Sequence, residues 1–140
     1  MITETYPPEV NGVALTIHQL VVGLAERGHE VEVIRPKQSR ADWPKIEGRI
    51  EQVTVPGMPL PRYSGLHFGL PLRGRLINRW KRQRPDVTHF ATEGPLGLTA
   101  MWAAEKLNIP VTSSFHTNFH QYGKHYGFGF AHGLVLRYMR

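Results

Sequence analysis

The residues best suited to chemistry lie where predicted strands lead into loops or helices. Gly12 has no Cβ, so another molecule can approach its backbone closely, and Asn11 can cap the helix that follows. A strand that leads into a glycine and an open helix N-terminus favours binding of an anion, typically a phosphate. His116 directly follows a predicted strand, where it can donate to a ligand oxygen or act as an acid or base.

Further polar side chains fall in the same loops, Glu4–Gly12, Thr92–Pro95 and Ser114–His125. They are Glu4, Tyr6, Thr92, Glu93, Thr117, Asn118, His120 and Tyr122. Each candidate also has an ordinary structural interpretation. Gly12 is a single glycine without the G-x-G-x-x-G pattern and can be a turn residue. Glu93 can simply place negative charge near a helix N-terminus, and His116 can be a partly exposed loop residue.

A metal site is not predicted. His116 and His120 are four positions apart, but no H-E-x-x-H glutamate accompanies them, and the chain has no cysteine. An oxidoreductase that uses a dinucleotide is also disfavoured, because the G-x-G-x-x-G motif and the acidic residue that binds the ribose are missing.

An alternation of strands and helices is predicted to position these loops. The predicted strands are Met1–Thr3, which is short, and then Glu30–Arg35, Ile50–Val55, Asp86–Ala91 and Pro110–Phe115. The predicted helices run from Val13 to Gly28, from Leu72 to Arg84, from Pro95 to Leu107 and from about Phe130. Lys37–Gly48 and Pro56–Pro71 are predicted to lack helix and strand. This order indicates an α/β fold, a Rossmann-like parallel sheet with flanking helices, whose ligands bind at the carboxyl ends of the strands.

Local signals support these helices and loops. The first helix has an apolar face formed by Val13, Ile17, Leu20, Val21 and Leu24. Gly28 is suited to a left-handed stop, and Pro95 is suited to the first helical position. Because Pro7 and Pro8 fix the backbone torsion, Tyr6–Glu9 is expected to be extended.

Composition is that of a single soluble globular domain. The chain has 140 residues, 41% of them hydrophobic and 20% charged. No apolar run approaches the roughly 20 residues that span a bilayer, and the start of the chain does not resemble a signal peptide. The lack of cysteine fits a reducing compartment. A net charge of +6 favours anionic partners such as nucleotides, acidic lipids or nucleic acid.

The positive charge is concentrated in the third quarter of the chain. No acidic residue lies between Glu51 and Asp86, whereas Arg73, Arg75, Arg79 and Arg82 all belong to the helix predicted there. One interpretation is a helix packed through Leu72, Leu76, Ile77 and Trp80 with a solvated basic face. The other is a surface that meets anionic lipid headgroups. Nucleic acid is not predicted, because no binding motif accompanies the charge.

Four sequence blocks, in order, carry a family resemblance that covers nearly the whole chain. They read TETYPPEVNGVALTIHQLVVGLAERGHEVEVIRP, VPGMPLPRYSGLHFGLP, RPDVTHFATEGPLG and SSFHTNFHQYGKHYG. The chain resembles family 4 (group 1) retaining glycosyltransferases, and most of all the branch of α-mannosyltransferases and sulfoquinovosyl or glycolipid transferases.

The resemblance implies the N-terminal half of a GT-B fold, in which two Rossmann-like domains enclose the active site. By the same resemblance, Asn11 and Gly12 approach the donor's pyrophosphate, and His116 lies near the transferred sugar as the catalytic candidate. Glu4, Tyr6, Glu93, Thr117, Asn118 and Tyr122 are candidates for lining the acceptor side of the cleft. The expected co-substrate is GDP-mannose or a UDP-sugar, with no bound cofactor and no metal.

Two departures from the family pattern shape the functional hypothesis. The second, donor-binding domain is absent, and the first strand is short, so residues 1–140 are expected to be an acceptor-side domain truncated at both ends. We expect the whole enzyme to transfer a sugar, mannose in the first instance, to a lipid or glycan, and the isolated chain to be nearly inactive. The alternative is a non-catalytic module that binds an anionic ligand or a membrane surface. The expected location is the cytoplasm, and the inner face of the membrane is compatible with it.

Overall fold

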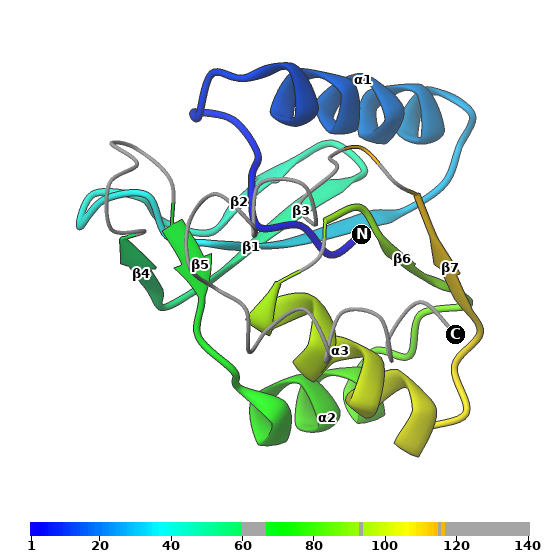
Figure 1. The fold of residues 1–140 in the computed structure, drawn as a ribbon. Coiled ribbons are helices and arrows are strands. Elements are labelled where there is room, and N and C mark those ends of the chain that lie inside the picture. The colour runs from blue at the N-terminus through cyan, green and yellow to red at the C-terminus, as the bar shows by residue number, and fades with distance from the viewer. Residues whose placement is uncertain (60–66, 93, 115, 117–140) are drawn as a thin grey trace.

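The protein is a layered α/β domain, seen here in a computed structural model that describes residues 1–59, 67–92, 94–114 and 116. Its helices are α1 (Gly12–Glu26), α2 (Arg73–Arg82) and α3 (Pro95–Lys106). Its strands are β1 (Val31–Pro36), β2 (Lys45–Glu47), β3 (Ile50–Val55), β4 (Gly57–Pro59), β5 (His67–Gly69), β6 (Thr88–Phe90) and β7 (Val111–Ser113). Helix α1 covers one face of the sheet, and α2 and α3 cover the other (Figure 1).

The sheet is built around the first residues of the chain. Ile2 forms parallel bridges with Ile34 of β1 and with Phe90 of β6, so it joins the β1–β3 pair to the β6–β7 pair. Both pairs are parallel, and β2 adds an antiparallel strand beyond β3. With Ile2 counted as the first strand, the parallel strands have the order 3-2-1-4-5 of a Rossmann-like fold. The predicted fold class is therefore confirmed, and the connectivity reverses between Ile2 and β6.

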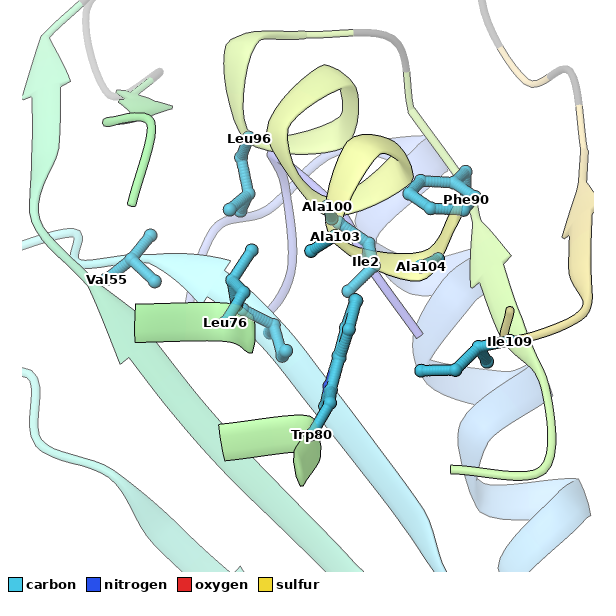
Figure 2. Close-up of a cluster of buried hydrophobic side chains, with 11 residues drawn as sticks. Ile2, Val55, Leu76, Trp80, Phe90, Leu96, Ala100, Ala103, Ala104 and Ile109 are labelled. Carbon is cyan, nitrogen blue, oxygen red and sulfur yellow. The ribbon is translucent and has the colours of Figure 1, made fainter. Parts of the chain in front are cut away.

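Two apolar clusters fill the two faces of the sheet. Because side chains alternate along a strand, the neighbours Val33 and Ile34 of β1 belong to opposite clusters. Ile17 and Val21 of α1 pack on the Val33 side. The Ile34 side contains side chains from α2, α3 and β6, which Figure 2 shows turned toward one another around Ile2. Its members include Leu76, Trp80, Phe90, Leu96, Ala100 and Ala103.

The predicted helix signals are largely confirmed. Asn11 is the N-cap of α1, where its Oδ1 accepts the Ala14 N–H at 2.8 Å. Gly28 follows the helix with a φ of 92°, and Pro95 is the first residue of α3. The predicted face of α1 was wrong in one position: Leu20 is 41% exposed, and Ala14 is buried instead.

Two segments predicted to lack strands contain short ones. Strand β2 falls within Lys37–Gly48, where three exposed residues pair with β3 at the sheet edge without an apolar alternation to mark them. Strands β4 and β5 fall within Pro56–Pro71 and pair with each other in antiparallel fashion. The glycines that suggested loop are required for close packing. A Cβ on Gly57 would lie 2.7 Å from the Lys37 carbonyl oxygen, and one on Gly69 would lie 2.8 Å from the Leu96 Cβ.

The segment Tyr6–Glu9 is a turn, so the prediction of an extended run was wrong. The Pro7–Pro8 peptide bond is cis, and the Glu9 N–H donates to the Tyr6 carbonyl at 3.1 Å. The sequence alone could not distinguish this turn from an extended segment, because proline fixes φ in both.

The other strand predictions are confirmed: β3 has the predicted bounds, β1 is shifted by one residue, and β6 and β7 are shorter than predicted. Strand β6 occupies the middle of the predicted Asp86–Ala91, and β7 the middle of Pro110–Phe115. Within the described residues, no helix is long and apolar enough to cross a membrane. The predicted loop beyond His116 and the helix from about Phe130 lie outside the described part of the chain.

Candidate functional site at the carboxyl edge of the sheet

The predicted loops meet at one edge of the sheet. The backbone N–H of Glu4, which follows the Ile2 segment, donates to Thr92 Oγ1 after β6 at 2.7 Å. The N–H of Ser114, which follows β7, donates to the carbonyl of Phe90 at the end of β6 at 3.0 Å. The structure therefore brings together segments that are up to 110 positions apart in the 140-residue sequence, at the reversal point where ligands bind in open α/β sheets.

Glu4 is buried at this edge, and its carboxylate ties three segments together. Oε2 accepts the Gly69 N–H at 2.6 Å, and Oε1 accepts the Leu96 N–H, in the first turn of α3, at 2.9 Å. A Cβ on Gly94 would lie 2.1 Å from Glu4 Oε1, so the carboxylate occupies the space beside that glycine. Burial raises the pKa of Glu4 to about 7, although the backbone hydrogen bonds act in the opposite direction. Its proposed cleft role stays a prediction, and its contacts favour a positioning role.

Tyr6 is also enclosed by the domain. Its ring is 1% exposed and meets the His18 ring edge-on, and its hydroxyl lies 3.1 Å from His18 Nδ1. Burial raises the pKa of Tyr6 to about 12. The phenol therefore anchors the loop to α1, and its contact with an acceptor stays a prediction.

Asn11 and Gly12 open α1, but their environments differ. The Asn11 side chain is used inside the protein, because it caps Ala14 and its Nδ2 donates to Thr5 Oγ1 at 2.8 Å and to Glu9 Oε1 at 3.1 Å. Gly12 is exposed, and apart from its chain neighbours and the adjacent backbone of its own helix no described atom lies within 4 Å of the position a Cβ would take. Its φ is not in the left-handed region. The described fold therefore does not require glycine at position 12.

His116 lies at the end of a line of polar side chains. Its Nε2 is 2.7 Å from Ser114 Oγ, which is 2.9 Å from Nε2 of His89 in β6. His89 Nδ1 is in turn 2.9 Å from Thr112 Oγ1 in β7. Burial lowers the pKa of His89, and positive charge at the amino terminus and at His116 lowers it further. Sequence reasoning missed His89, although one signal was present: a polar residue between two apolar-facing positions in a short strand.

A buried ion pair near this edge was also missed. Arg35 is 1% exposed and donates to both carboxylate oxygens of Asp42, at 2.6 and 2.8 Å. Burial alone would raise the pKa of Asp42, but the hydrogen bonds from Arg35 and from the Gln38 N–H lower it. The Gln38 side chain also donates to Glu9 Oε2 at 2.7 Å, so the pair braces the loop that precedes Gly12.

The other predicted site residues lie outside the described part of the chain. They are Glu93, Thr117, Asn118, His120 and Tyr122. Among the described residues, no group of three or more histidine, aspartate or glutamate side chains could hold a metal ion.

One arginine of the basic helix α2 is paired with acidic residues and is not part of its solvent-exposed basic surface. Arg79 of α2 pairs with Glu32 of β1 and Glu51 of β3. Arg73 lies over the Trp102 ring at 5.4 Å from its centroid, and Arg75 and Arg82 are exposed. The prediction that Arg79 joins a lipid-facing set is corrected, because its guanidinium is already neutralised between two strands.

Fold and site together define a Rossmann-like α/β domain whose polar side chains gather at the carboxyl edge of a parallel sheet. A family model described as Glycosyltransferase Family 4 matches residues 10–140. The chain belongs to that family.

Individual relatives support this assignment. A GDP-mannose-dependent alpha-mannosyltransferase of Mycolicibacterium smegmatis is 32% identical over 133 residues, which cover 94% of this chain and 35% of the relative. An alpha-monoglucosyldiacylglycerol synthase of Streptococcus pneumoniae is 29% identical, over 98% of this chain and 30% of the relative. The enzyme of the same name from Acholeplasma laidlawii is 33% identical, over 86% and 30%. The chain thus spans about a third of the length of these relatives.

Proposed function

We propose that this chain is the acceptor-side domain of a two-domain retaining glycosyltransferase. The whole enzyme would transfer a sugar, mannose in the first instance, from GDP-mannose or a UDP-sugar to a lipid or glycan acceptor. Membership of glycosyltransferase family 4 supports the reaction class. The name of the mannosyltransferase supports GDP-mannose as donor, and the name of the glucosyldiacylglycerol synthases supports a lipid acceptor.

The observation that carries the proposal is the open space beside Gly12. A helix N-terminus carries partial positive charge and backbone N–H groups that suit a diphosphate. Asn11 satisfies the Ala14 N–H, and the space beside the exposed Gly12 contains no described atom. A glycine that the fold does not need, at the start of a helix on the ligand-binding edge, is explained by close approach of a ligand.

The contrast with α3 strengthens this assignment. Its N-terminus opens on the same edge, but the Glu4 carboxylate already accepts the Leu96 N–H there. An anionic ligand at the α3 N-terminus would have to compete with the Glu4 carboxyl group for that N–H. The start of α1 is therefore the better place for the diphosphate, and His116 at the end of β7 would face the transferred sugar.

The protein's contribution to the reaction would be positioning and charge stabilisation. In a same-face transfer with retained configuration, the acceptor oxygen forms the new bond to the anomeric carbon as the bond to the nucleoside diphosphate breaks. The leaving diphosphate takes the acceptor's proton. Helix N–H groups near Gly12 would stabilise the negative charge that develops on that diphosphate. No bound cofactor is needed for this step.

Substitution of Gly12 tests the proposal in the full-length protein. We expect Gly12→Ala to fold normally, because no described atom contacts the new methyl group, but to lower transfer from GDP-mannose by about 10-fold or more because the diphosphate is displaced. Gly74→Ala is the matched control, since Gly74 also lies in the first turn of a helix with no described atom within 4 Å. Equal activity of the two variants in a radiolabelled transfer assay would contradict the placement of the donor.

A peripheral position at the inner face of the membrane also belongs to the proposal. The lipid acceptor named for the glucosyldiacylglycerol synthases supports it, and so does the basic surface of α2. That surface is formed by Arg73, Arg75 and Arg82 without Arg79. Anionic lipid headgroups are the partners that such a surface suits.

A further inference from the structure

Three residues with no role in the proposed reaction form a line that ends at His116, and of these Ser114 contacts His116 directly. His89 and Thr112 are register partners in the parallel β6–β7 pair, and Ser114 follows β7 at the carboxyl edge. The side chains form an unbroken line: Thr112 Oγ1 to His89 Nδ1 at 2.9 Å, His89 Nε2 to Ser114 Oγ at 2.9 Å, and Ser114 Oγ to His116 Nε2 at 2.7 Å. All three distances are those of good hydrogen bonds.

Counting protons shows that the two histidines are coupled through Ser114. The serine hydroxyl has one proton, so it can donate to only one of the two Nε2 atoms, and when it does so it must accept from the other. When the serine donates to His116 Nε2, a neutral His116 carries its proton on Nδ1, and His89 donates from Nε2. When the serine donates to His89 Nε2, His116 donates from Nε2, and a neutral His89 carries its proton on Nδ1, which can donate to Thr112.

The same line fixes which edge of His116 is left for other partners. Its Nε2 edge is held by Ser114, and its Nδ1 makes no hydrogen bond to the part of the chain that the structure describes. His89 is well placed to hold this arrangement, because it sits half-buried in a strand whose neighbours fix its ring. Burial also lowers the pKa of His89, which favours the neutral ring that a tautomer-selecting partner requires.

We propose that His89 and Ser114 are positioning residues for His116. They hold its Nε2 edge and select one tautomer, so that Nδ1 is the nitrogen presented to the reacting sugar. This role deepens the proposed transferase function, in which His116 faces the sugar. A purely structural tie between β6 and β7 would use the same contacts, but its loss would leave kcat of a folded variant unchanged.

The tautomer can be measured without any activity assay. The full-length protein, labelled with 15N-histidine, is studied by two-bond proton–nitrogen correlation spectra, which distinguish Nδ1–H from Nε2–H rings. In spectra recorded at alkaline pH, where histidine rings are neutral, we expect His116 to show a single tautomer in the wild type and a mixture in Ser114→Ala. Ser114→Thr keeps the hydroxyl and should keep the wild-type pattern. His29→Ala, which removes an exposed histidine elsewhere, is the control.

The His116 spectrum of the variants decides whether Ser114 and His89 select the tautomer. An unchanged His116 pattern in Ser114→Ala, in a spectrum that is otherwise native, would overturn the proposal. His89→Leu breaks the line from the other side and should give the same mixture as Ser114→Ala. It also supplies an independent test if Ser114→Ala does not fold.

Kinetics with GDP-mannose provide a second readout. We expect Ser114→Ala and His89→Leu to lower kcat about 10- to 100-fold with little change in KM for the donor, because a displaced His116 acts on the transferred sugar and not on the nucleotide. If the wild-type protein transfers no sugar, the proposed function fails while the tautomer result still decides the role of His89 and Ser114. If kcat is unchanged in variants whose tautomer has changed, the positioning role is overturned.

Discussion

At the scale of single residues, Glu4 shows how burial changes the role of a carboxylate. Its position in the sequence suggested a side chain lining a cleft. In the structure it accepts the N–H groups of Gly69 and Leu96 and lies against Gly94, which has no room for a Cβ. A single buried side chain therefore holds the start of α3, the end of β5 and the loop at Gly94 in place.

The stability of the protein should depend on the titration of Glu4. Its pKa is about 7 in the folded protein, against an ordinary value of 4.5, so the folded state holds a proton that the unfolded chain releases. Its contribution to the free energy of unfolding is fully present below pH 4.5 and is lost as the pH rises through 7. The size of that loss is on the order of 3 kcal/mol.

Urea unfolding of wild type and Glu4→Gln at several pH values measures this dependence. Because glutamine does not titrate, the difference in the free energy of unfolding between the two proteins should shift by about 3 kcal/mol in favour of the variant from pH 4.5 to 7. Glu26→Gln, which changes an exposed glutamate of α1, should show no such shift. A constant difference for Glu4→Gln would mean that the carboxylate is ionised throughout this range.

At the scale of elements, the arginines of α2 lie on two sides of the helix and are expected to have different roles. Arg79 faces the sheet and pairs with Glu32 and Glu51, whereas Arg75 and Arg82 face outward. An Arg79→Ala variant should lose about 1–2 kcal/mol of stability, because two partly buried carboxylates lose their cation.

The outward arginines should affect membrane binding instead. An Arg75→Ser/Arg82→Ser variant should keep its stability and bind vesicles of phosphatidylglycerol about 30-fold more weakly at low salt, since each arginine near an anionic surface contributes about 1 kcal/mol. The charge-matched control is Arg27→Ser/Arg40→Ser, outside α2. Equal vesicle binding by the two double variants in sedimentation assays would rule out α2 as the lipid-facing element.

The same helix shows what a sequence can and cannot predict at this scale. The spacing of Leu76 and Trp80 correctly predicted the buried face of α2, because helical periodicity is a local property. The ion pairs of Arg79 depend on strands 28 to 47 positions away, and nothing local marks them. Likewise, Gly57 and Gly69 suggested loop, because their packing against Lys37 and Leu96 exists only in the folded domain.

The candidate site also has features that the sequence could predict and features that it could not. The order of strands and helices was enough to place the loops after Ile2, β6 and β7 at one edge, since parallel strands share their carboxyl ends. It could not reveal that Glu4 and Tyr6 are buried, or that His89 and Ser114 lead to His116. These facts depend on which way each side chain points and on what it meets across the sheet.

At the scale of the whole molecule, the open helix start at Gly12 would supply one side of the proposed diphosphate site. Helix N–H groups and a histidine from this domain can stabilise the leaving charge and orient the sugar, but no described group here resembles a site for a nucleoside base. The relatives are about three times as long as this chain. We therefore expect the remaining length to supply most of the donor affinity, so that the two parts form the active site between them.

Calorimetry with GDP-mannose tests this division. Residues 1–140 alone should bind the nucleotide-sugar at least about 100-fold more weakly than the full-length protein and should show almost no transfer, because the loss of a few hydrogen bonds and stacking contacts costs about 3 kcal/mol or more. Thermal unfolding of the isolated chain is the control for its folding. Robust transfer by residues 1–140 would contradict the two-part site and would mean that the edge formed by Ile2, β6 and β7 binds the whole donor.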